Sequence, residues 1–210
     1  MSGSVCNDGK GSECHNCQAE HFPLFFSRCR DPFVSQDTCC VNFRNVKEFA
    51  GLAVNLLGDF PASKSFSVVH FATEARTAGG LSSAAKARRT IDKLDYTGGR
   101  TNHAAAVREC QRSFSSGGAR RGARKNFILL VTDGVSSEPS FDPAGAATAA
   151  ATTAKADGTF IIPVFISPNN DWSPYRFMRS LSSDNNVFDV TDFAGLNSLL
   201  VRLVDRVSFT

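Results

Sequence analysis

Apolar side chains along this chain follow two alternating patterns, short runs and longer stretches with helical spacing. Four runs have the length of buried strands: residues 22–28, 66–71, 127–132 and 160–166. Between them, apolar residues recur every three or four positions, which is typical of amphipathic helices. The helices predicted in this way cover residues 43–57, 82–94, 103–114, 143–156, 174–181 and 193–206. An edge strand near residues 73–80 and a short strand at residues 187–190 complete the prediction.

The order of these elements predicts the fold class. Strands alternate with helices, which indicates an α/β protein with a mostly parallel central sheet and helices on both faces. Right-handed crossovers make such a sheet doubly wound, and ligands bind at the carboxyl ends of its strands. Residues 1–20 are polar and have no periodicity, so we expect a Cys-rich N-terminal arm over 1–20 and one domain over 21–210.

The cysteines are concentrated near the N-terminus. Of the seven in the chain, only Cys110 lies beyond residue 40. This placement favours disulfide bonds and therefore secretion into an oxidising compartment. Cys14 and Cys17 have the spacing of zinc ligands, so a zinc site is the alternative, whereas Cys110 falls on a predicted helix as a small buried residue. The candidate disulfide cysteines are Cys6, Cys14, Cys17, Cys29, Cys39 and Cys40.

Two polar residues stand where ligand-binding loops are expected. Asp133 follows the buried run that ends at Thr132, and Gly134 permits a tight turn after it. Thr101 follows a Gly-Gly pair, which lets the backbone approach a bound group closely. The alternative roles are local, because aspartate often accepts hydrogen bonds in turns and Asn102 can cap the next helix.

Four stretches in this order resemble von Willebrand factor type A domains: Asn42–Phe49, Val68–Phe71, Leu94–Asn102 and Ile128–Gly134. The resemblance extends from about residue 20 to the C-terminus. It implies a metal-ion-dependent adhesion site, in which an Asp-x-Ser-x-Ser loop, a threonine and an aspartate hold magnesium. Thr101 matches the threonine and Asp133 the aspartate. Magnesium prefers about six oxygen ligands, and hydroxyl ligands leave it enough charge to attract a partner's carboxylate.

The first loop of that site departs from the family pattern. Three registers are open, at residues 27–31, 31–35 and 37–41, and none supplies all three oxygen side chains. Ser27 and Asp31 are the remaining candidate ligands. Arg28 and Arg30 cannot bind a metal, but they are able to attract a partner's carboxylate by charge-assisted hydrogen bonds.

We therefore expect a secreted, non-enzymatic adhesion module that binds an extracellular protein or matrix partner, either through magnesium as a candidate cofactor or without a metal. The alternative is a structural matrix component that assembles through its faces and cysteines. The chain begins Met1-Ser2-Gly3-Ser4 without the features of a signal peptide, so secretion is inferred from the cysteines. The candidate partner contacts are Arg28, Arg30, Arg100, Asn102 and Ser136.

Composition and the remaining motifs argue against several other classes of partner and activity. A net charge of +3 is too small to favour nucleic acid. No apolar run has the length of a membrane span, and the nucleophile, phosphate-loop and zinc-protease motifs of enzymes are missing. The basic side chains at 88–89, 108, 112 and 120–125 indicate either an acidic polysaccharide site or a solvated charged face.

Overall fold

The computed structural model describes residues 36–59, 65–96, 98–116, 126–167 and 174–208, with side chains for residues 41–207 of these ranges. The expected N-terminal arm, the predicted strand at 22–28 and the basic residues 120–125 lie outside the described residues. The boundary between residues 20 and 21 therefore stays a prediction.

Three parallel strands form the buried part of the fold. The order is β3-β4-β5, and Val131 and Thr132 of β3 lie beside Val164 and Phe165 of β4. The apolar runs noted in the sequence form β3 and β4, because a strand covered on both faces needs apolar residues at nearly every position. The strand bounds are β3 (Asn126–Thr132), β4 (Thr159–Ile166) and β5 (Phe188–Val190).

A second pair of strands is antiparallel. β1 (Phe66–Phe71) and β2 (Ala75–Ser82) form a hairpin in which Phe71 is opposite Ala75. The predicted edge strand is confirmed two residues further along the chain than expected. Thr73 lies in the turn between the two strands, and this turn is next to the candidate site.

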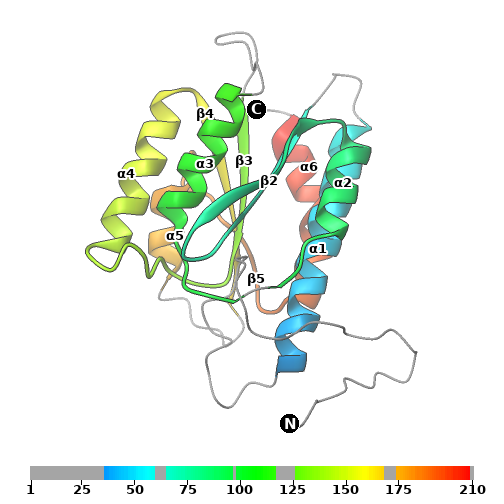
Figure 1. Cartoon of the computed structure of the whole chain (residues 1–210), viewed down its shortest axis with the longest axis horizontal. Coiled ribbons are helices and arrows are strands. Elements are labelled where there is room, and N and C mark those ends of the chain that lie inside the picture. Colours follow the sequence, from blue (N-terminus) through cyan, green and yellow to red (C-terminus); the bar gives the residue numbers. More distant parts are fainter. Residues whose placement is uncertain (1–35, 60–64, 97, 117–125, 168–173, 209–210) are drawn as a thin grey trace.

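Helices cover the strands from both sides, which confirms the α/β fold class (Figure 1). In this view α3, α4 and α5 lie on one side and α1, α2 and α6 on the other. α3 contacts α4 and both strands of the hairpin, and α1 contacts α2, α6 and η1. The helices are α1 (Gln36–Gly58), α2 (Ala84–Asp92), α3 (His103–Ser116), α4 (Pro143–Ala156), α5 (Tyr175–Leu181), the 3-10 helix η1 (Ala194–Leu199) and α6 (Leu200–Ser208).

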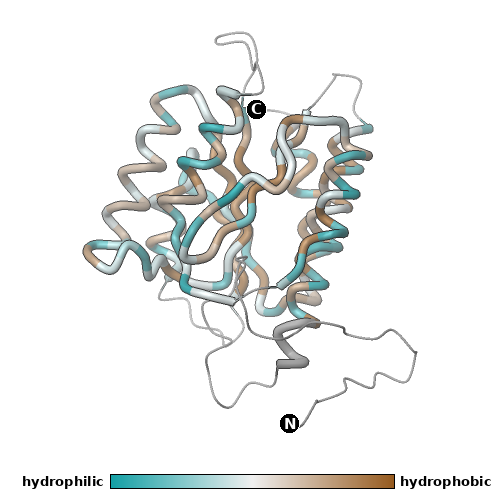
Figure 2. The backbone as a smooth tube through the Cα atoms, in the orientation of Figure 1, coloured by the Kyte–Doolittle hydropathy of each residue, from teal (hydrophilic) through white to brown (hydrophobic). Residues whose placement is uncertain are grey.

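The apolar core lies between these layers, where the central strands β3 and β4 are brown in Figure 2. Phe49 of α1, Phe71 of β1 and Phe165 of β4 are at most 2% exposed. Phe165 therefore contributes to the core from the sheet, and Phe49 contributes to it from a helix that covers the sheet. An apolar core between a sheet and its helices needs side chains from both layers. None of the described helices has the length and apolar character needed to cross a membrane.

Two predicted helix boundaries are wrong. α1 begins at Gln36, not at residue 43. The adjacent Cys39 and Cys40 in these first turns indicate a disulfide-bonded loop from the sequence, which hides the start of the helix. The same start makes residues 37–41 helical, so this register of the first loop is excluded. The last predicted helix is divided into η1 and α6, since residues 194–199 adopt the tighter 3-10 form.

Lys47 fixes the chain that leads into the candidate site. Its Nζ donates to the carbonyl oxygens of Asp92 and Leu94, both at 2.8 Å. The ammonium group of this α1 residue thereby supplies hydrogen bonds to carbonyl groups at the C-terminal end of α2. Burial lowers the pKa of Lys47, although the nearby carboxylates of Asp95 and Asp92 act in the opposite direction. The segment between α2 and α3 therefore starts from a fixed point.

Candidate functional site

The glycine loop before Thr101 packs directly against the β1–β2 turn. Gly98 and Gly99 have φ values of 66° and 114°, which a residue with a side chain rarely adopts. A Cβ atom on Gly99 would lie 3.1 Å from the Cβ of Ala72, so the glycine also permits the close approach. The amide of Arg100 donates to Thr73 Oγ1 at 3.2 Å, and the side chain of Asn102 donates to Thr73 O at 3.0 Å.

The backbone of Thr101 is bound to the loop that follows β3. Its amide donates to Ser137 Oγ at 3.0 Å, and its carbonyl accepts from the amides of Ser137 and Glu138 at 2.8 and 3.0 Å. The hydroxyl of Ser136 donates to the same carbonyl at 3.3 Å. These hydrogen bonds use the backbone of Thr101 and leave its hydroxyl outside them. Thr101 is 3% exposed, so its side chain lies almost entirely out of solvent.

Asp133 follows the last residue of β3 at the same edge of the sheet. Thr132 Oγ1 lies 3.1 Å from His103 Nε2, which joins the end of β3 to the start of α3. Along the chain, Asp133 directly follows Thr132, and Thr101 lies two residues before His103. Oδ1 of Asp133 is buried, and buried carboxylates are paired with donors or bind metals. The contact between His103 and Thr132 therefore brings the segment that carries Thr101 to the end of β3 that Asp133 follows, and the role of the two residues as ligands stays a prediction.

His103 is an uncharged residue under this site. It is fully buried between the rings of Phe71 and Phe177, whose centroids each lie 5.6 Å from its own. Burial lowers the pKa of His103 to about 3, so the imidazole is neutral at physiological pH. Its Nδ1 has no hydrogen-bond partner among the described residues. A neutral ring adds no positive charge that would repel a bound cation.

The expected partner contacts differ in their exposure. Arg100 has a side chain that is 58% exposed and forms an ion pair with Glu138 at 2.9 Å. Asn102 caps α3, since its Oδ1 accepts from the amide of Ala105 at 2.9 Å. Ser136 is 6% exposed and binds within the loop. Arg100 is therefore the one described member of the set that presents a charged side chain to solvent, while Ser136 and Asn102 hold the loops. Contact with a partner stays a prediction for all three.

Several candidates from the first loop cannot be placed. Ser27, Arg28, Arg30 and Asp31 lie outside the described residues, and so do four of the six candidate disulfide cysteines. Cys39 and Cys40 belong to the first turns of α1. Cys110 packs against the core as expected, and burial, followed by the charge of Glu109, raises the pKa of its thiol to about 12.

The donor set at the edge fits a hard cation in part. The hydroxyl of Thr101 and the carboxylate of Asp133 are oxygen ligands, which magnesium and manganese prefer. The described residues contain no group of three His, Cys, Asp or Glu side chains that could hold a metal. A complete site therefore needs oxygens from water, from a partner or from the residues outside the described ranges.

Sequence reasoning missed the residues that hold the site together. Ser137 and Glu138 bind the backbone of Thr101, Thr73 supports the glycine loop, and His103 joins α3 to β3. The polar run after Gly134 was a usable signal for Ser137. A single threonine in a turn gives no such signal, and His103 looks like a solvated residue at the start of a helix.

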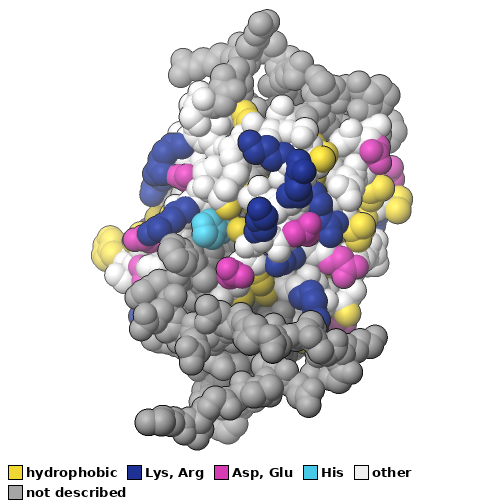
Figure 3. Space-filling view, turned by 45° about the vertical axis from the view of Figure 1, so that its right-hand side comes forward, with side chains coloured by type: hydrophobic (Ala, Val, Ile, Leu, Met, Phe, Trp, Pro, Cys, Tyr) yellow, Lys and Arg dark blue, Asp and Glu magenta, His cyan; other side chains and the backbone are white. Residues whose placement is uncertain are grey.

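Basic side chains are spread over one face of the molecule, with acidic side chains among them (Figure 3). Arg88 forms an ion pair with Asp92, and Arg112 forms one with Glu109. Arg108 is exposed. The described part of the predicted basic region is therefore partly neutralised, which favours the solvated-face alternative over a polysaccharide site.

Comparison with known proteins agrees with the fold. Proximal thread matrix protein 1 from the mussel byssus is 22% identical with a TM-score of 0.66, over 79% of this chain and 42% of that one. A von Willebrand factor type A protein from Catenulispora acidiphila is also 22% identical with a TM-score of 0.64, over 81% of this chain and 39% of that one. The chain thus spans about two fifths of the length of these proteins.

A more distant neighbour is the manganese-loaded TRAP protein of Plasmodium vivax, which is 16% identical with a TM-score of 0.57, over 76% of this chain and 65% of that one. No curated protein matches the sequence. The model of the von Willebrand factor type A domain matches residues 35–202, which is most of the chain. The chain therefore belongs to the von Willebrand factor type A domain family.

Proposed function

We propose that this domain is an extracellular, non-enzymatic adhesion module that binds a protein or matrix partner at the carboxyl edge of its sheet. The observation that carries the proposal is the set of hydrogen bonds that joins the backbone of Thr101 to the segment that follows Asp133. The backbone of Thr101 is fixed by hydrogen bonds from the 136–138 segment, while its hydroxyl stays outside them. A preorganised pair of oxygens is suited to recognition, because little ordering is needed on binding.

A divalent cation would link these two residues to the partner. Thr101 and Asp133 would hold magnesium or manganese, and the cation would supply positive charge for a carboxylate of the partner. The neutral His103 beneath the site leaves that charge undiminished. The solved structures support a metal at this position. The mussel protein has been described with zinc in its metal-ion-dependent adhesion site (MIDAS) motif, and the Plasmodium protein with manganese.

The arrangement favours binding over catalysis. The one imidazole at the site among the described residues has its Nε2 within hydrogen-bond distance of Thr132, and its ring is enclosed by two phenylalanines. It therefore cannot reach a substrate to transfer a proton, which a general base must do. Extracellular location is supported by the N-terminal cysteines and by the matrix origin of the mussel protein.

A structural role in a matrix is the second candidate, and the mussel thread protein favours it. It differs from the first in one measurable respect, because assembly requires the chain to associate with itself. Sedimentation velocity of the full chain over a wide concentration range separates the two. A size that is independent of concentration supports the adhesion module, and a size that grows with concentration supports the matrix component.

A peptide selection tests the adhesion proposal directly. A random peptide library displayed on phage is panned on the immobilised full chain in buffer with magnesium, and bound phage are eluted with EDTA. We expect peptides that contain Asp or Glu to be enriched. Their synthetic forms should lose affinity for the variants Thr101→Ala and Asp133→Asn, and they should bind normally to Asp205→Asn, which changes an exposed aspartate on α6.

Two results would contradict the proposal. One is the absence of any enriched acidic peptide. The other is equal binding of the selected peptides to wild type, Thr101→Ala and Asp133→Asn. If acidic peptides bind equally well with EDTA and lose affinity only on Arg28→Ala or Arg30→Ala, these arginines replace the metal and the metal-dependent form of the proposal is wrong.

A further inference from the structure

An open cleft lies between α5 and β5. Its volume is about 1000 Å³, which is in the size range of clefts that hold small ligands. Thr101 and Asp133 do not line this cleft, and the residues that do are all polar. They come from α5, from β5 and from the turn between them: Tyr175, Arg176, Arg179, Ser180, Asn185 and Asp189.

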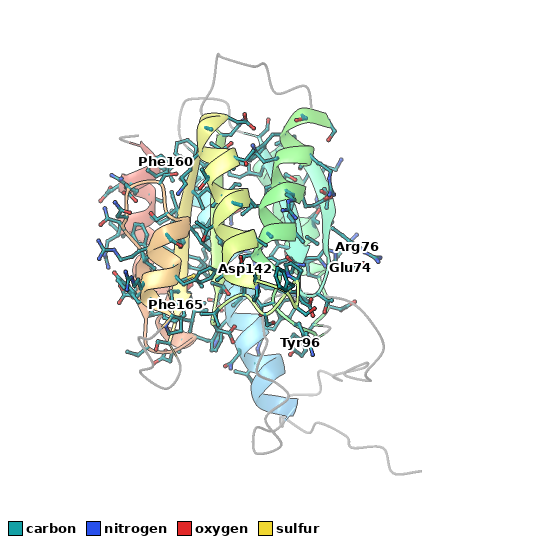
Figure 4. The ribbon with its side chains drawn as sticks, turned by 90° about the vertical axis from the view of Figure 1, so that its left-hand side faces the viewer. Glu74, Arg76, Tyr96, Asp142, Phe160 and Phe165 are labelled. Carbon is teal, nitrogen blue, oxygen red and sulfur yellow. The ribbon has the colours of Figure 1, made fainter. Side chains whose placement is uncertain are left out.

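The cleft is remote from the candidate site at the carboxyl edge. In Figure 4, α3, α4 and α5 stand in a row in front of the strands, and α5 ends the row on the side away from Glu74 and Arg76. Glu74 follows Thr73 in the β1–β2 turn, which holds the loop before Thr101. A ligand in the cleft therefore occupies a second site on the domain.

Hydrogen bonds fix the walls of the cleft. Lys155 of α4 donates to the carbonyl oxygens of Ser180 and Ser182, both at 3.1 Å, and this holds the end of α5. Nε of Arg179 donates to Asn185 O at 3.0 Å. Asn185 has a φ of 59°, in the left-handed region that asparagine adopts more readily than most residues. The guanidinium group of Arg179 is therefore oriented at the cleft before a ligand arrives, which lowers the entropy cost of binding.

Two arginines dominate the charge of the cleft. Arg176 and Arg179 are exposed and lie three residues apart on one face of α5. Among the described residues neither has an ion-pair partner, even though Asp189 lines the same cleft. Asp189 comes from the opposite wall, because Phe188 before it packs under Arg202 of α6 and successive side chains of a strand point to opposite faces. The cleft thus presents two unpaired guanidinium groups and, apart from them, one carboxylate.

We propose that this cleft binds a sulfated saccharide. The guanidinium groups match the oxygens of a sulfate group, because they form paired, charge-assisted hydrogen bonds with oxyanions. Asp189 repels a ligand that is anionic throughout, but its carboxylate accepts hydrogen bonds from sugar hydroxyl groups. Tyr175 supplies an aromatic ring against which the apolar face of a sugar can pack. A ligand that carries both an anionic group and several hydroxyl groups satisfies all of these side chains, and it binds in addition to the partner at the carboxyl edge.

Calorimetric titration of the full chain with a sulfated disaccharide prepared from heparin tests the proposal. We expect one site per chain, and at least a tenfold loss of affinity on Arg176→Gln, because this variant removes charge-assisted hydrogen bonds to the sulfate group. Arg89→Gln is the matched control, since it removes the same charge from an exposed arginine on α2, and it should bind as wild type does. The midpoint of urea unfolding should be the same for both variants, because neither arginine is part of the core.

Four results would overturn the proposal. The first is no binding of the disaccharide to wild type. The second is equal binding of inorganic sulfate or of the desulfated disaccharide, which would show that the cleft recognises an anion alone or no anion. The third is an equal loss of affinity in Arg176→Gln and Arg89→Gln, which would place the ligand outside the cleft. The fourth is tighter binding of a Glu-rich peptide that also depends on Arg176, which would make the cleft a protein contact.

The carboxyl-edge variants separate this inference from the proposed function. Thr101→Ala should bind the disaccharide as wild type does, because Thr101 does not line the cleft. Arg176→Gln should likewise bind the selected acidic peptides as wild type does. Loss of disaccharide binding in Thr101→Ala would show that the saccharide occupies the carboxyl edge, and the assignment to the cleft would be wrong.

Discussion

The buried imidazole of His103 makes the stability of the domain depend on pH. The ring is fully buried, and burial lowers its pKa from 6.5 to about 3. Below about pH 6.5 the unfolded chain binds a proton at this position and the folded chain does not. Stability is therefore complete above the unfolded pKa and falls as the pH drops toward the folded value.

The size of the effect follows from the two pKa values. Between about pH 7 and about pH 5, linkage to His103 removes about 2 kcal/mol from the free energy of unfolding, and the full loss below about pH 3 approaches 5 kcal/mol. The variant His103→Leu removes the titrating group. It also loses the contact with Thr132 and some packing, so we expect it to be less stable than wild type at neutral pH by about 1–3 kcal/mol.

Urea unfolding at the two pH values checks this prediction. Wild type should lose about 2 kcal/mol more than His103→Leu on the change from neutral to acidic buffer. Met178→Leu serves as the control, because Met178 is also fully buried but does not titrate, and it should keep the pH dependence of wild type. The reasoning is refuted if His103→Leu and wild type lose the same free energy between the two buffers.

Three further substitutions test the architecture of the site by urea unfolding. Gly99→Ala places a side chain at a φ of 114° and 3.1 Å from Ala72, so it should cost about 1–3 kcal/mol. Gly145→Ala should cost about 1–2 kcal/mol, because its Cβ overlaps the carboxylate of Asp142 that caps α4. Arg100→Ala breaks an exposed ion pair and should cost less than about 1 kcal/mol; a larger loss would show that this pair is more than a surface contact.

Strong local patterns allowed much of the fold to be predicted from the sequence. β3 and β4 are continuous apolar runs, and α4 begins at Pro143 and ends at Ala156 as expected. Proline fixes a helical φ and lacks an amide that would otherwise need a partner, which makes it a reliable first residue. The glycine pair likewise marked the tight loop before Thr101, and the apolar run ending at Thr132 marked the strand that Asp133 follows; the role of both residues in binding stays a prediction.

The contacts that hold the site could not be predicted, because they depend on how distant segments meet. Ser136 resembles an exposed loop serine in the sequence, yet it is buried against the carbonyl of Thr101. His103 looks like a residue at a helix start, and only the fold encloses it between Phe71 and Phe177. Periodicity describes one segment at a time and carries no information about such long-range pairs.

Calorimetric titration of the full chain with manganese tests the central claim most directly. Manganese takes the same oxygen ligands as magnesium. The account predicts one binding site per chain that is lost in Thr101→Ala and in Asp133→Asn and retained in Asp205→Asn. Binding that is equally strong in all three variants, or no binding to wild type, would contradict the claim that Thr101 and Asp133 form a cation-dependent recognition site.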